Sequence, residues 1–296
     1  MKGWLIVNNF MRSRKFDELY ELLSLAAGKE GIELKTVKTG KLPHSVNALK
    51  ELVKDVDFAL FWDKDVILAK QLEACGLRLF NSARAVEGCD NKALTAIALE
   101  KAGVPTPETY VAPLTFEGVA IDDFGFAQDA AEKLGYPLVV KEVSGSFGQQ
   151  VYLADDFDGL KKIIKSIGHK GFLMQKFVKS SRGRDIRVNV VGGKVVCAME
   201  RHSENGDFRS NVTLGGSAKA CRLSKEQKAV AVRACRALGL DFAGVDVLFG
   251  ENGPLICEVN SNPHFKSTLD ATGIDLAGVI MKYIKAKLQT ESRRRT

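Results

Sequence analysis

The sequence predicts a mixed α/β protein that begins with a parallel sheet and continues as α+β. Two patterns predict it: apolar runs alternate with amphipathic segments at the start, and strand-rich segments with glycine-containing turns follow. The chain has 296 residues, 45% hydrophobic and 27% charged, an ordinary globular balance. No apolar run approaches the roughly 18 residues that a spanning helix needs, so we expect no membrane association.

The first part of the chain alternates strands with helices. Such an order forms a parallel sheet covered by helices on both faces. The GxGxxG fingerprint is absent, which argues against dinucleotide binding. The expected strands are Trp4–Asn8, Ile32–Val37, Val56–Phe61 and Leu77–Phe80, and the expected helices are Phe16–Ala27, Ser45–Lys54 and Val66–Cys75.

A second unit follows a helix that starts near Lys92 and the linker-like segment Pro105-Thr106-Pro107. It combines strands and helices around a glycine- and serine-rich loop at residues 144–150. The expected strands are Pro137–Val143, Val151–Ala154 and Gly171–Val178, and the expected helices are Phe126–Leu134 and Phe157–Ile167.

The third unit starts with two strands joined at Gly192-Gly193 and continues through a polar loop to a helix. Ser224 and Gln227 form a capping box for that helix, and Gly239 is a suitable stop. The expected domains are residues 1–86, 87–175 and 176–290, with a basic tail at 291–296.

Residues 241–260 predict a β-hairpin with the three-residue loop Glu251-Asn252-Gly253. In that register one face carries Asp246 opposite Glu258, with Asn260 two residues further on. The other face carries the apolar pairs Val245–Val259, Val247–Cys257 and Phe249–Leu255.

The opposed Asp246 and Glu258 would repel each other unless a divalent cation lay between them. Carboxylate and amide oxygens are the hard ligands that Mg²⁺ prefers, often together with substrate phosphates. The hairpin therefore predicts a metal site at these residues and Asn260. A solvated acidic face is an equally weighted alternative.

Lys141 ends the apolar run 136–140, and a strand there would hold its ammonium group rigidly. The loop at 144–150 offers backbone N–H groups to phosphate oxygens, although it lacks the Walker A pattern and an ordinary turn is the simpler alternative. The end of the strand at 172–178 has the pattern of an adenine-reading segment, with a core or edge strand as the alternative.

The net charge is +7, with Arg293, Arg294 and Arg295 near the end of the chain. A phosphate-handling site accounts for this balance, and a solvated C-terminus is favoured over a nucleic-acid-binding tail. The six cysteines form no CxxC pair, which indicates reduced thiols and a cytoplasmic protein.

Short motifs from about Asn81 onward resemble, in order and spacing, the ATP-grasp superfamily and within it the RimK-type α-L-glutamate ligases. The motifs are Asp90-Asn91-Lys92, residues 105–109, Gly135–Lys141, Gln175–Val178, Gly183–Arg187, Gly206–Asn211, Ala243–Asp246 and Glu258-Val259-Asn260.

The resemblance implies an ATP-grasp fold with an N-terminal Rossmann-like domain, a small central lid domain and a C-terminal domain. It implies ATP and two Mg²⁺ (or Mn²⁺) ions as cofactors. The implied nucleotide-binding residues are Lys92, Lys141, Gln175, Lys176, Phe177, Val178, Asp185, Arg209, Ser210 and Asn211, and the implied metal ligands are Asp246, Glu258 and Asn260.

The implied reaction is an ADP-forming ligation: a carboxylate attacks the γ-phosphate of ATP, and an amine then displaces phosphate from the acyl phosphate. Arg187 and Arg201 are candidate catalytic residues that stabilise the transferred group. The expected partners are glutamate as the amine and a protein, peptide or small-molecule acceptor, within a homo-oligomer. His264 and Lys266 are expected at the acceptor mouth, with a solvent-facing position as the alternative.

The chain departs from its relatives at Gln149-Gln150, at Lys176 and in the segment Ser261–Ser267. That segment is closer to relatives acting on amino-group carrier proteins than to the ribosomal-protein modifier, which leaves the acceptor open. The alternative class is a non-catalytic ATP-binding regulator or a ribosome-associated protein. A D-alanine–D-alanine-type ligase is a weaker match.

Overall fold

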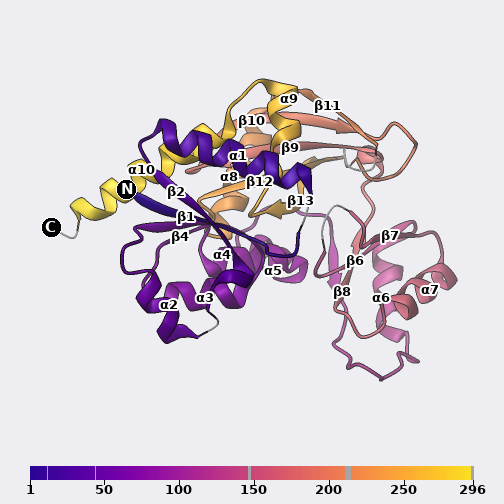
Figure 1. Ribbon diagram of the computed structural model, residues 1–296. Helices are drawn as coiled ribbons and strands as arrows, with labels where there is room; N and C mark the ends of the chain where they lie inside the picture. Colours follow the sequence, from indigo (N-terminus) through magenta and orange to yellow (C-terminus); the bar gives the residue numbers. More distant parts are fainter. Residues whose placement is uncertain (12, 44, 146–147, 211–214, 295–296) are drawn as a thin grey trace.

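The computed structural model describes residues 1–11, 13–43, 45–145, 148–210 and 215–294. These residues form three β-sheets with associated helices. Figure 1 shows the N-terminal and C-terminal sheets close together and the central unit extending to one side. The mixed α/β architecture expected from the sequence is confirmed.

The N-terminal sheet consists of β1 (Lys2–Val7), β2 (Glu33–Lys38), β3 (Phe58–Trp62) and β4 (Leu79–Phe80). It is parallel, with the order β2-β1-β3-β4, as the alternating pattern predicts. Every residue of β3 is buried, because helices cover both faces of a parallel sheet. The carboxyl end of β3 leads directly into Asp63 and Lys64.

The helices on this sheet are α1 (Arg14–Lys29), α2 (Val46–Leu52), α3 (Val66–Ala74) and α10 (Leu276–Arg293). Leu19 and Leu23 of α1 share a core cluster with Ile280 and Ile284 of α10 on one face. Helices α2 and α3 cover the other face. The last helix thus returns to the first sheet, where its apolar stripe is buried beside α1.

Helices α4 (Ala83–Asp90) and α5 (Lys92–Lys101) lead from the first sheet to the central unit. The sequence analysis expected only the second of them. Side-chain oxygens of Ser82 and Asn91 cap α4 and α5 respectively. The signal that could have predicted α4 is Ser82, a residue type that favours the N-cap position of a helix.

The central sheet consists of β5 (Thr109–Val111), β6 (Leu138–Glu142), β7 (Val151–Ala154) and β8 (Phe172–Lys176), with helices α6 (Gly125–Leu134) and α7 (Phe157–Ile167). Its strands are antiparallel in the order β5-β8-β6-β7. Leu138 and Val140 join the core cluster with the helices. Because side chains alternate along a strand, Val139 and Lys141 face the opposite way.

The C-terminal sheet consists of β9 (Arg184–Val191), β10 (Lys194–His202), β11 (Ser217–Ala220), β12 (Phe242–Gly250) and β13 (Gly253–Asn260), with helices α8 (Lys225–Ala237) and α9 (Lys266–Thr272). It is antiparallel, in the order β11-β10-β9-β12-β13. Gly192 and Gly193, with φ values of 57° and 73°, connect β9 to β10 as expected. The predicted capping box of α8 is confirmed, since Ser224 and Gln227 bond reciprocally.

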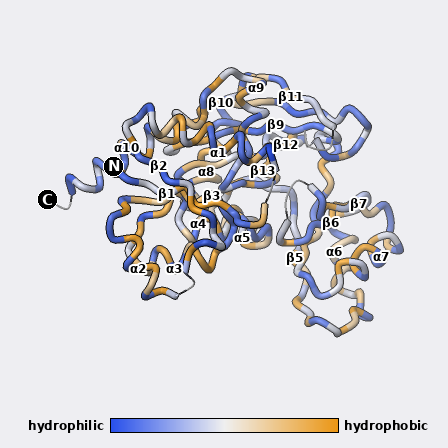
Figure 2. Tube along the Cα trace, in the orientation of Figure 1, coloured by the Kyte–Doolittle hydropathy of each residue, from blue (hydrophilic) through white to orange (hydrophobic). Residues whose placement is uncertain are grey.

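The C-terminal end of α10 is hydrophilic (Figure 2) and remains helical through Arg293. The residues expected to form a basic tail therefore begin inside a helix, and residues 295–296 lie outside the described part. The four expected domain limits stay a prediction. Over the described residues, no helix is both long and apolar enough to span a membrane.

Candidate active site

The β12–β13 hairpin is the centre of the candidate site. Asp246 pairs with Glu258 in the antiparallel ladder, and Val245 pairs with Val259, as the sequence predicts. Asn260 follows two residues after Glu258, on the same side of the strand. The predicted juxtaposition of two carboxylates and an amide is therefore present.

The predicted turn of this hairpin is one residue too long. Gly250 pairs with Gly253, so two residues connect the strands instead of three. The apolar pairs expected near the turn are consequently wrong. The observed pairs are Val247–Ile256, Leu248–Leu255 and Phe249–Pro254, in place of Val247–Cys257 and Phe249–Leu255.

A β-bulge offsets the shorter turn. Cys257 is the additional residue between the pairs at Ile256 and Glu258, and it restores the expected register at Asp246. Its Sγ lies 3.5 Å from Nζ of Lys141, so it faces the central unit rather than the expected core. Burial raises the pKa of the Cys257 thiol.

Asp246 is buried between two guanidinium groups. Arg187 binds it through Nε and through Nη2, the latter at 3.0 Å, and Arg201 Nη2 lies 3.0 Å from Oδ1. Burial alone would raise the pKa of Asp246, but Arg187 and Arg201 lower it overall. The carboxylate is thus ionised and fixed in place.

Arg201 is held from its other side by Asp185. Its Nε donates to Asp185 Oδ1 at 2.7 Å, and its Nη2 donates to Oδ2. Burial would lower the pKa of Arg201, whereas Asp246 and Asp185 raise it above its ordinary value. Asp185, implied by the resemblance to contact the nucleotide, is placed here against Arg201.

Two lysines approach the space between the central and C-terminal sheets. Nζ of Lys141 donates to Oε1 of Gln175 at 2.7 Å, and Nζ of Lys92 donates to the carbonyl of Gly145 at 3.3 Å. Burial lowers the pKa of Lys92, which Glu258 partly offsets. Both lysines lie where their sequence pattern predicts, on β6 and at the start of α5.

The segment after β8 closes the same space. Phe177 contacts Phe208 edge-to-face, with ring centroids 6.3 Å apart. Lys176, Phe177 and Val178 all line the cavity there, and Lys176 donates its backbone N–H to the carbonyl of Glu108. Lys176 is exposed, whereas Phe177 and Val178 are partly buried, and their role as an adenine-reading hinge stays a prediction.

Arg209 and Ser210 line the same cavity as the lysines. Arg209 pairs with Asp207, at 2.6 Å between Nη2 and Oδ2, and its Nη1 donates to the carbonyl of Gly148 at 2.5 Å. The glycine-rich loop is therefore bonded to Arg209 near one end and to Lys92 near the other. Asn211, the remaining predicted nucleotide contact, lies outside the described residues.

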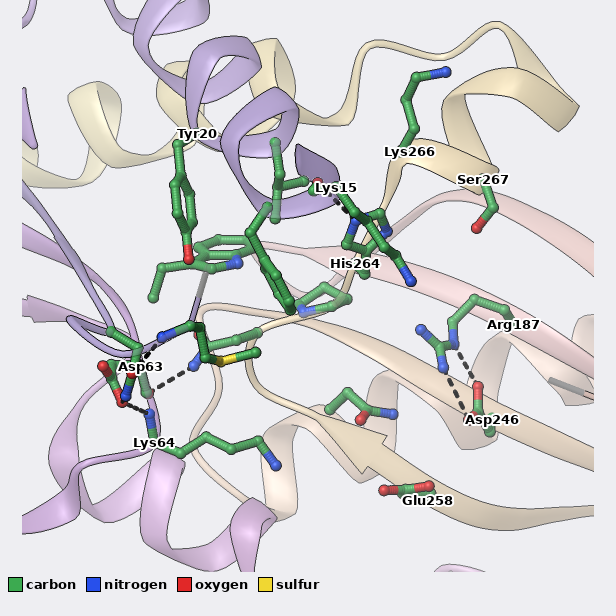
Figure 3. A pocket seen from close by; sticks show the side chains of 18 of the residues that line it. Lys15, Tyr20, Asp63, Lys64, Arg187, Asp246, Glu258, His264, Lys266 and Ser267 are labelled. Carbon is green, nitrogen blue, oxygen red and sulfur yellow. Dashed lines mark hydrogen bonds and ion pairs between the residues drawn. The ribbon is translucent and has the colours of Figure 1, made fainter. Parts of the chain in front are cut away.

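Two cavities meet at the hairpin. The first, of about 110 Å³, lies between the central and C-terminal sheets and is lined by the two lysines and the 176–178 segment. The second, of about 540 Å³, lies between the N-terminal and C-terminal units. Arg201, Asp246 and Glu258 line both cavities. The paired Arg187 and Asp246 stand on one side of the larger cavity (Figure 3).

The larger cavity includes residues that the sequence analysis missed. Tyr20 of α1 and Trp62, Asp63 and Lys64 at the end of β3 line it. The position of Asp63-Lys64 at the carboxyl end of a parallel strand was the available signal, since ligands bind at that edge. His264 and Lys266 line this cavity too, while their expected position at the acceptor mouth stays a prediction.

His264 is half-buried against the start of α1. One ring nitrogen lies 3.2 Å from the carbonyl of Lys15, and the ring packs edge-to-face on Phe16. Burial lowers the pKa of His264 to about 4, so the ring is neutral near pH 7.

The donor atoms at the hairpin suit a hard divalent cation. Asp246, Glu258 and Asn260 supply carboxylate and amide oxygens from adjoining strands. In the described part of the chain, no cluster of three or more His, Cys, Asp or Glu side chains forms a metal site. Two carboxylates and an amide instead fit a cation that takes its remaining ligands from water and phosphate.

The three sheets and the two joined cavities define an ATP-grasp protein. Residues 89–284 match the RimK-like ATP-grasp domain, and the chain belongs to this family. The family expected from the sequence motifs is thereby confirmed.

Named relatives are similar over about three quarters of this chain. Beta-citrylglutamate synthase B of Danio rerio is 39% identical over 235 residues, covering 79% of this chain and 56% of the relative. N-acetylaspartylglutamate synthase A of Homo sapiens is 39% identical over 228 residues, covering 76% and 57%. A probable alpha-L-glutamate ligase of Legionella pneumophila (strain Corby) is 36% identical over 225 residues, covering 74% and 70%. The chain spans little more than half the length of the first two relatives.

Solved structures share the fold over nearly the whole chain. A RimK domain protein from Sphaerobacter thermophilus has a TM-score of 0.71 at 22% identity, covering 95% of this chain and 98% of that one. D-alanine–D-alanine ligase from Bacillus anthracis in complex with ATP has a TM-score of 0.74 at 20% identity, covering 100% of both. At these identities the likeness shows the ATP-grasp fold alone.

Proposed function

We propose that this protein is an ATP-dependent ligase that joins a carboxylate to an amine through an acyl phosphate and releases ADP. The observation that carries the proposal is the wall of Arg201, Asp246 and Glu258 shared by the two cavities. A γ-phosphoryl group at that wall is accessible from the nucleotide on one side and from a substrate on the other. The larger cavity, about 540 Å³, is of the size that small-molecule ligands occupy.

The nucleotide belongs in the smaller cavity. Lys92 and Lys141 contact its phosphates, and Gln175 with residues 176–178 holds the adenine. Arg209, Ser210 and Asn211 complete the nucleotide site. At about 110 Å³ the cavity is below the roughly 300 Å³ of a typical ligand pocket, so it must widen to admit a whole ATP molecule.

Asp246, Glu258 and Asn260 are the proposed ligands of Mg²⁺ or Mn²⁺, with two ions expected. Bound there, the ions neutralise negative charge on the phosphates. Arg187 then remains beside Asp246, at the side of the larger cavity.

In the first step, a carboxylate oxygen attacks the γ-phosphorus while the bond to the β–γ bridging oxygen breaks, giving an acyl phosphate and ADP. In the second, the amine nitrogen attacks the acyl carbon, the bond to phosphate breaks, and an amide forms with loss of one proton. Arg187 and Arg201 stabilise the negative oxygens in both steps, since fixed charges need no reorganisation during the reaction.

The names of the relatives favour glutamate as the amine, because each name refers either to a glutamate-containing product or to a glutamate ligase. The acceptor is a carboxylic acid carried by a small molecule, peptide or protein. We further propose a cytoplasmic enzyme that assembles as a homo-oligomer.

The test is ADP release from Mg-ATP with glutamate and each other amino acid, with and without clarified cytosolic extract, followed by mass analysis. We expect release that depends on one amino acid, with a matching mass increment in a product. Glu258→Gln is the matched low-activity control. Tight ATP binding without release in any mixture would instead favour the non-catalytic ATP-binding alternative.

A further inference from the structure

Two buried acceptor oxygens in the larger cavity lack a hydrogen-bond donor. Within the described part of the chain, Asp63 Oδ2 and Asn262 Oδ1 have no hydrogen-bond partner. Both residues line the cavity, and Asp63 is only 7% exposed. Buried polar atoms in native proteins are nearly always paired, so two unpaired acceptors in one cavity wall mark a place where a donor group can bind.

The two residues are bonded directly to each other. Asn262 Nδ2 donates to the backbone carbonyl of Asp63 at 2.8 Å. Asp63 Oδ1 accepts from the backbone N–H groups of Lys64 at 2.6 Å and Asp65 at 3.1 Å, and from Asn8 Nδ2 at 3.4 Å. One oxygen of Asp63 thus holds the loop after β3, while the other is left for a ligand.

The side chain of the neighbouring Lys64 does not pair with the Asp63 carboxylate. Lys64, next to Asp63 in the chain, pairs its side chain with Asp90 instead. Burial raises the pKa of Asp63, as expected where the ionised form lacks a cationic partner. A ligand with a positive charge and several N–H groups can donate to these oxygens and also supply the counter-charge that Asp63 lacks, which a neutral donor does not supply.

Aromatic side chains line the same cavity. Trp62 precedes Asp63, and Tyr20 lies close enough for Asp63 to contribute, after burial, to raising the Tyr20 pKa to about 12. Ammonium groups bind favourably beside such rings. Figure 3 shows Tyr20 and Asp63 on one side of the cavity and Arg187 with Asp246 on the other.

We infer that Asp63 and Asn262 form a binding site for a primary ammonium group of the substrate whose carboxylate is activated. This inference rests on the proposed function, because it extends the substrate cavity of that ligase. The attacking amine must lie at the wall shared with the nucleotide, so an ammonium group on the opposite side belongs to the other substrate. The activated substrate is therefore a carboxylic acid with a free amino group, its carboxylate facing Arg187.

The test measures binding of matched probes to the full chain with a non-hydrolysable ATP analogue and Mg²⁺. The aminated probes are γ-aminobutyrate, δ-aminovalerate and ε-aminocaproate, and their matches are butyrate, valerate and caproate. We expect at least one aminated probe to bind about tenfold more tightly than its match, since a charge-assisted hydrogen bond has that magnitude. Equal or weaker binding of all three aminated probes would overturn the inference.

Asp63→Asn is the decisive variant because it keeps Oδ1 and the side-chain shape while removing the charge. We expect the preference for the aminated probe to fall below about threefold. Asp65→Asn, the same change two residues away at the cap of α3, should keep the full preference. Retention of the preference in Asp63→Asn would contradict the assignment.

A second variant and a competition experiment complete the test. Asn262→Ser withdraws the second acceptor, together with the Nδ2 bond to the Asp63 backbone carbonyl, but keeps the Asp63 carboxylate. It should reduce the preference partially, and it tests the site if Asp63→Asn folds poorly. Glutamate should not compete with the aminated probe; competition would assign the ammonium to the incoming amino acid and overturn the inference. The probe-binding measurements need no turnover. A failure of the ammonium site would therefore appear in probe binding, whereas a failure of the proposed ligase function would appear in ADP release.

Discussion

Asp246 and Glu258 face each other across β12 and β13, yet they differ in their surroundings. Asp246 is 5% exposed and binds the guanidinium groups of Arg187 and Arg201. Glu258 is only half-buried and lines both cavities. Two residues proposed as ligands of the same cations should therefore respond differently to the loss of their charge.

Glu258→Gln should strongly reduce turnover and spare the fold. Removing one ligand charge weakens cation binding and the stabilisation of the phosphoryl group, so we expect kcat/KM for ATP to fall by about 100-fold. Thermal unfolding should shift little, because the residue is half-buried. Wild-type ADP release from this variant at saturating Mg²⁺ would disprove the metal assignment.

Asp246→Asn should lose stability as well as activity. The change leaves Arg187 and Arg201 buried without their shared counter-charge, and breaking such a pair costs about 3–5 kcal/mol. Urea unfolding checks this against Glu258→Gln as the matched carboxylate-to-amide control. Equal unfolding midpoints in the two variants would show that the buried arginines do not depend on Asp246.

Asp185→Asn separates two roles for one residue. If Asp185 positions Arg201, as their two hydrogen bonds indicate, kcat should fall by about tenfold or more while the affinity for an ATP analogue stays constant. If Asp185 contacts the nucleotide itself, affinity should fall instead. Calorimetric titration of the analogue, combined with steady-state rates, decides between them.

Lys141→Met should weaken ATP-analogue binding by about tenfold or more, because it removes a positive charge held beside Gln175 in the nucleotide cavity. Lys170→Met is the control. Lys170 also pairs with a residue of β6, at 3.1 Å from Glu142, but its side chain is 58% exposed and lies outside the cavity lining. Similar affinities for the two variants would remove Lys141 from the nucleotide site.

The stability of the protein should fall in mild acid because of His264. Burial lowers its pKa to about 4 from the ordinary 6.5, so between these pH values the unfolded chain binds more protons than the folded one. This contribution is fully present above pH 6.5 and is lost progressively as pH falls towards 4. Urea unfolding at pH 7 and pH 5 should show a smaller acid loss in His264→Gln than in wild type. Identical losses would contradict a neutral His264 ring in the folded protein.

The site was predictable where a side chain's position follows from local pattern. Lys141 was found from the apolar run that it ends, and the Asp246–Glu258 pair was found from the alternation of the hairpin. That pair was correct although the turn was assigned one residue too long, because the bulge at Cys257 cancels the error. A bulge has no reliable sequence signal, so Cys257 was wrongly expected in the core.

The remaining features depend on contacts between distant segments. The return of α10 to the first sheet and the placement of Asp63 beside Asn262 join residues that are far apart in the chain. The position of Asp185 against Arg201 depends likewise on the register between β9 and β10. Hydrophobic periodicity and composition do not indicate which of several buried polar residues will contact each other in the folded chain.

The most direct test of the central claim is the stoichiometry of the reaction with the acceptor in hand. In a mixture of protein, Mg-ATP, the amino acid selected by ADP release and the acceptor fraction, ADP and the new amide should be measured together. The account predicts one ADP for each amide bond, with both products strongly reduced in Glu258→Gln. ADP release without an amide, or an amide formed without ADP, would contradict a ligase working across the wall of Arg201, Asp246 and Glu258.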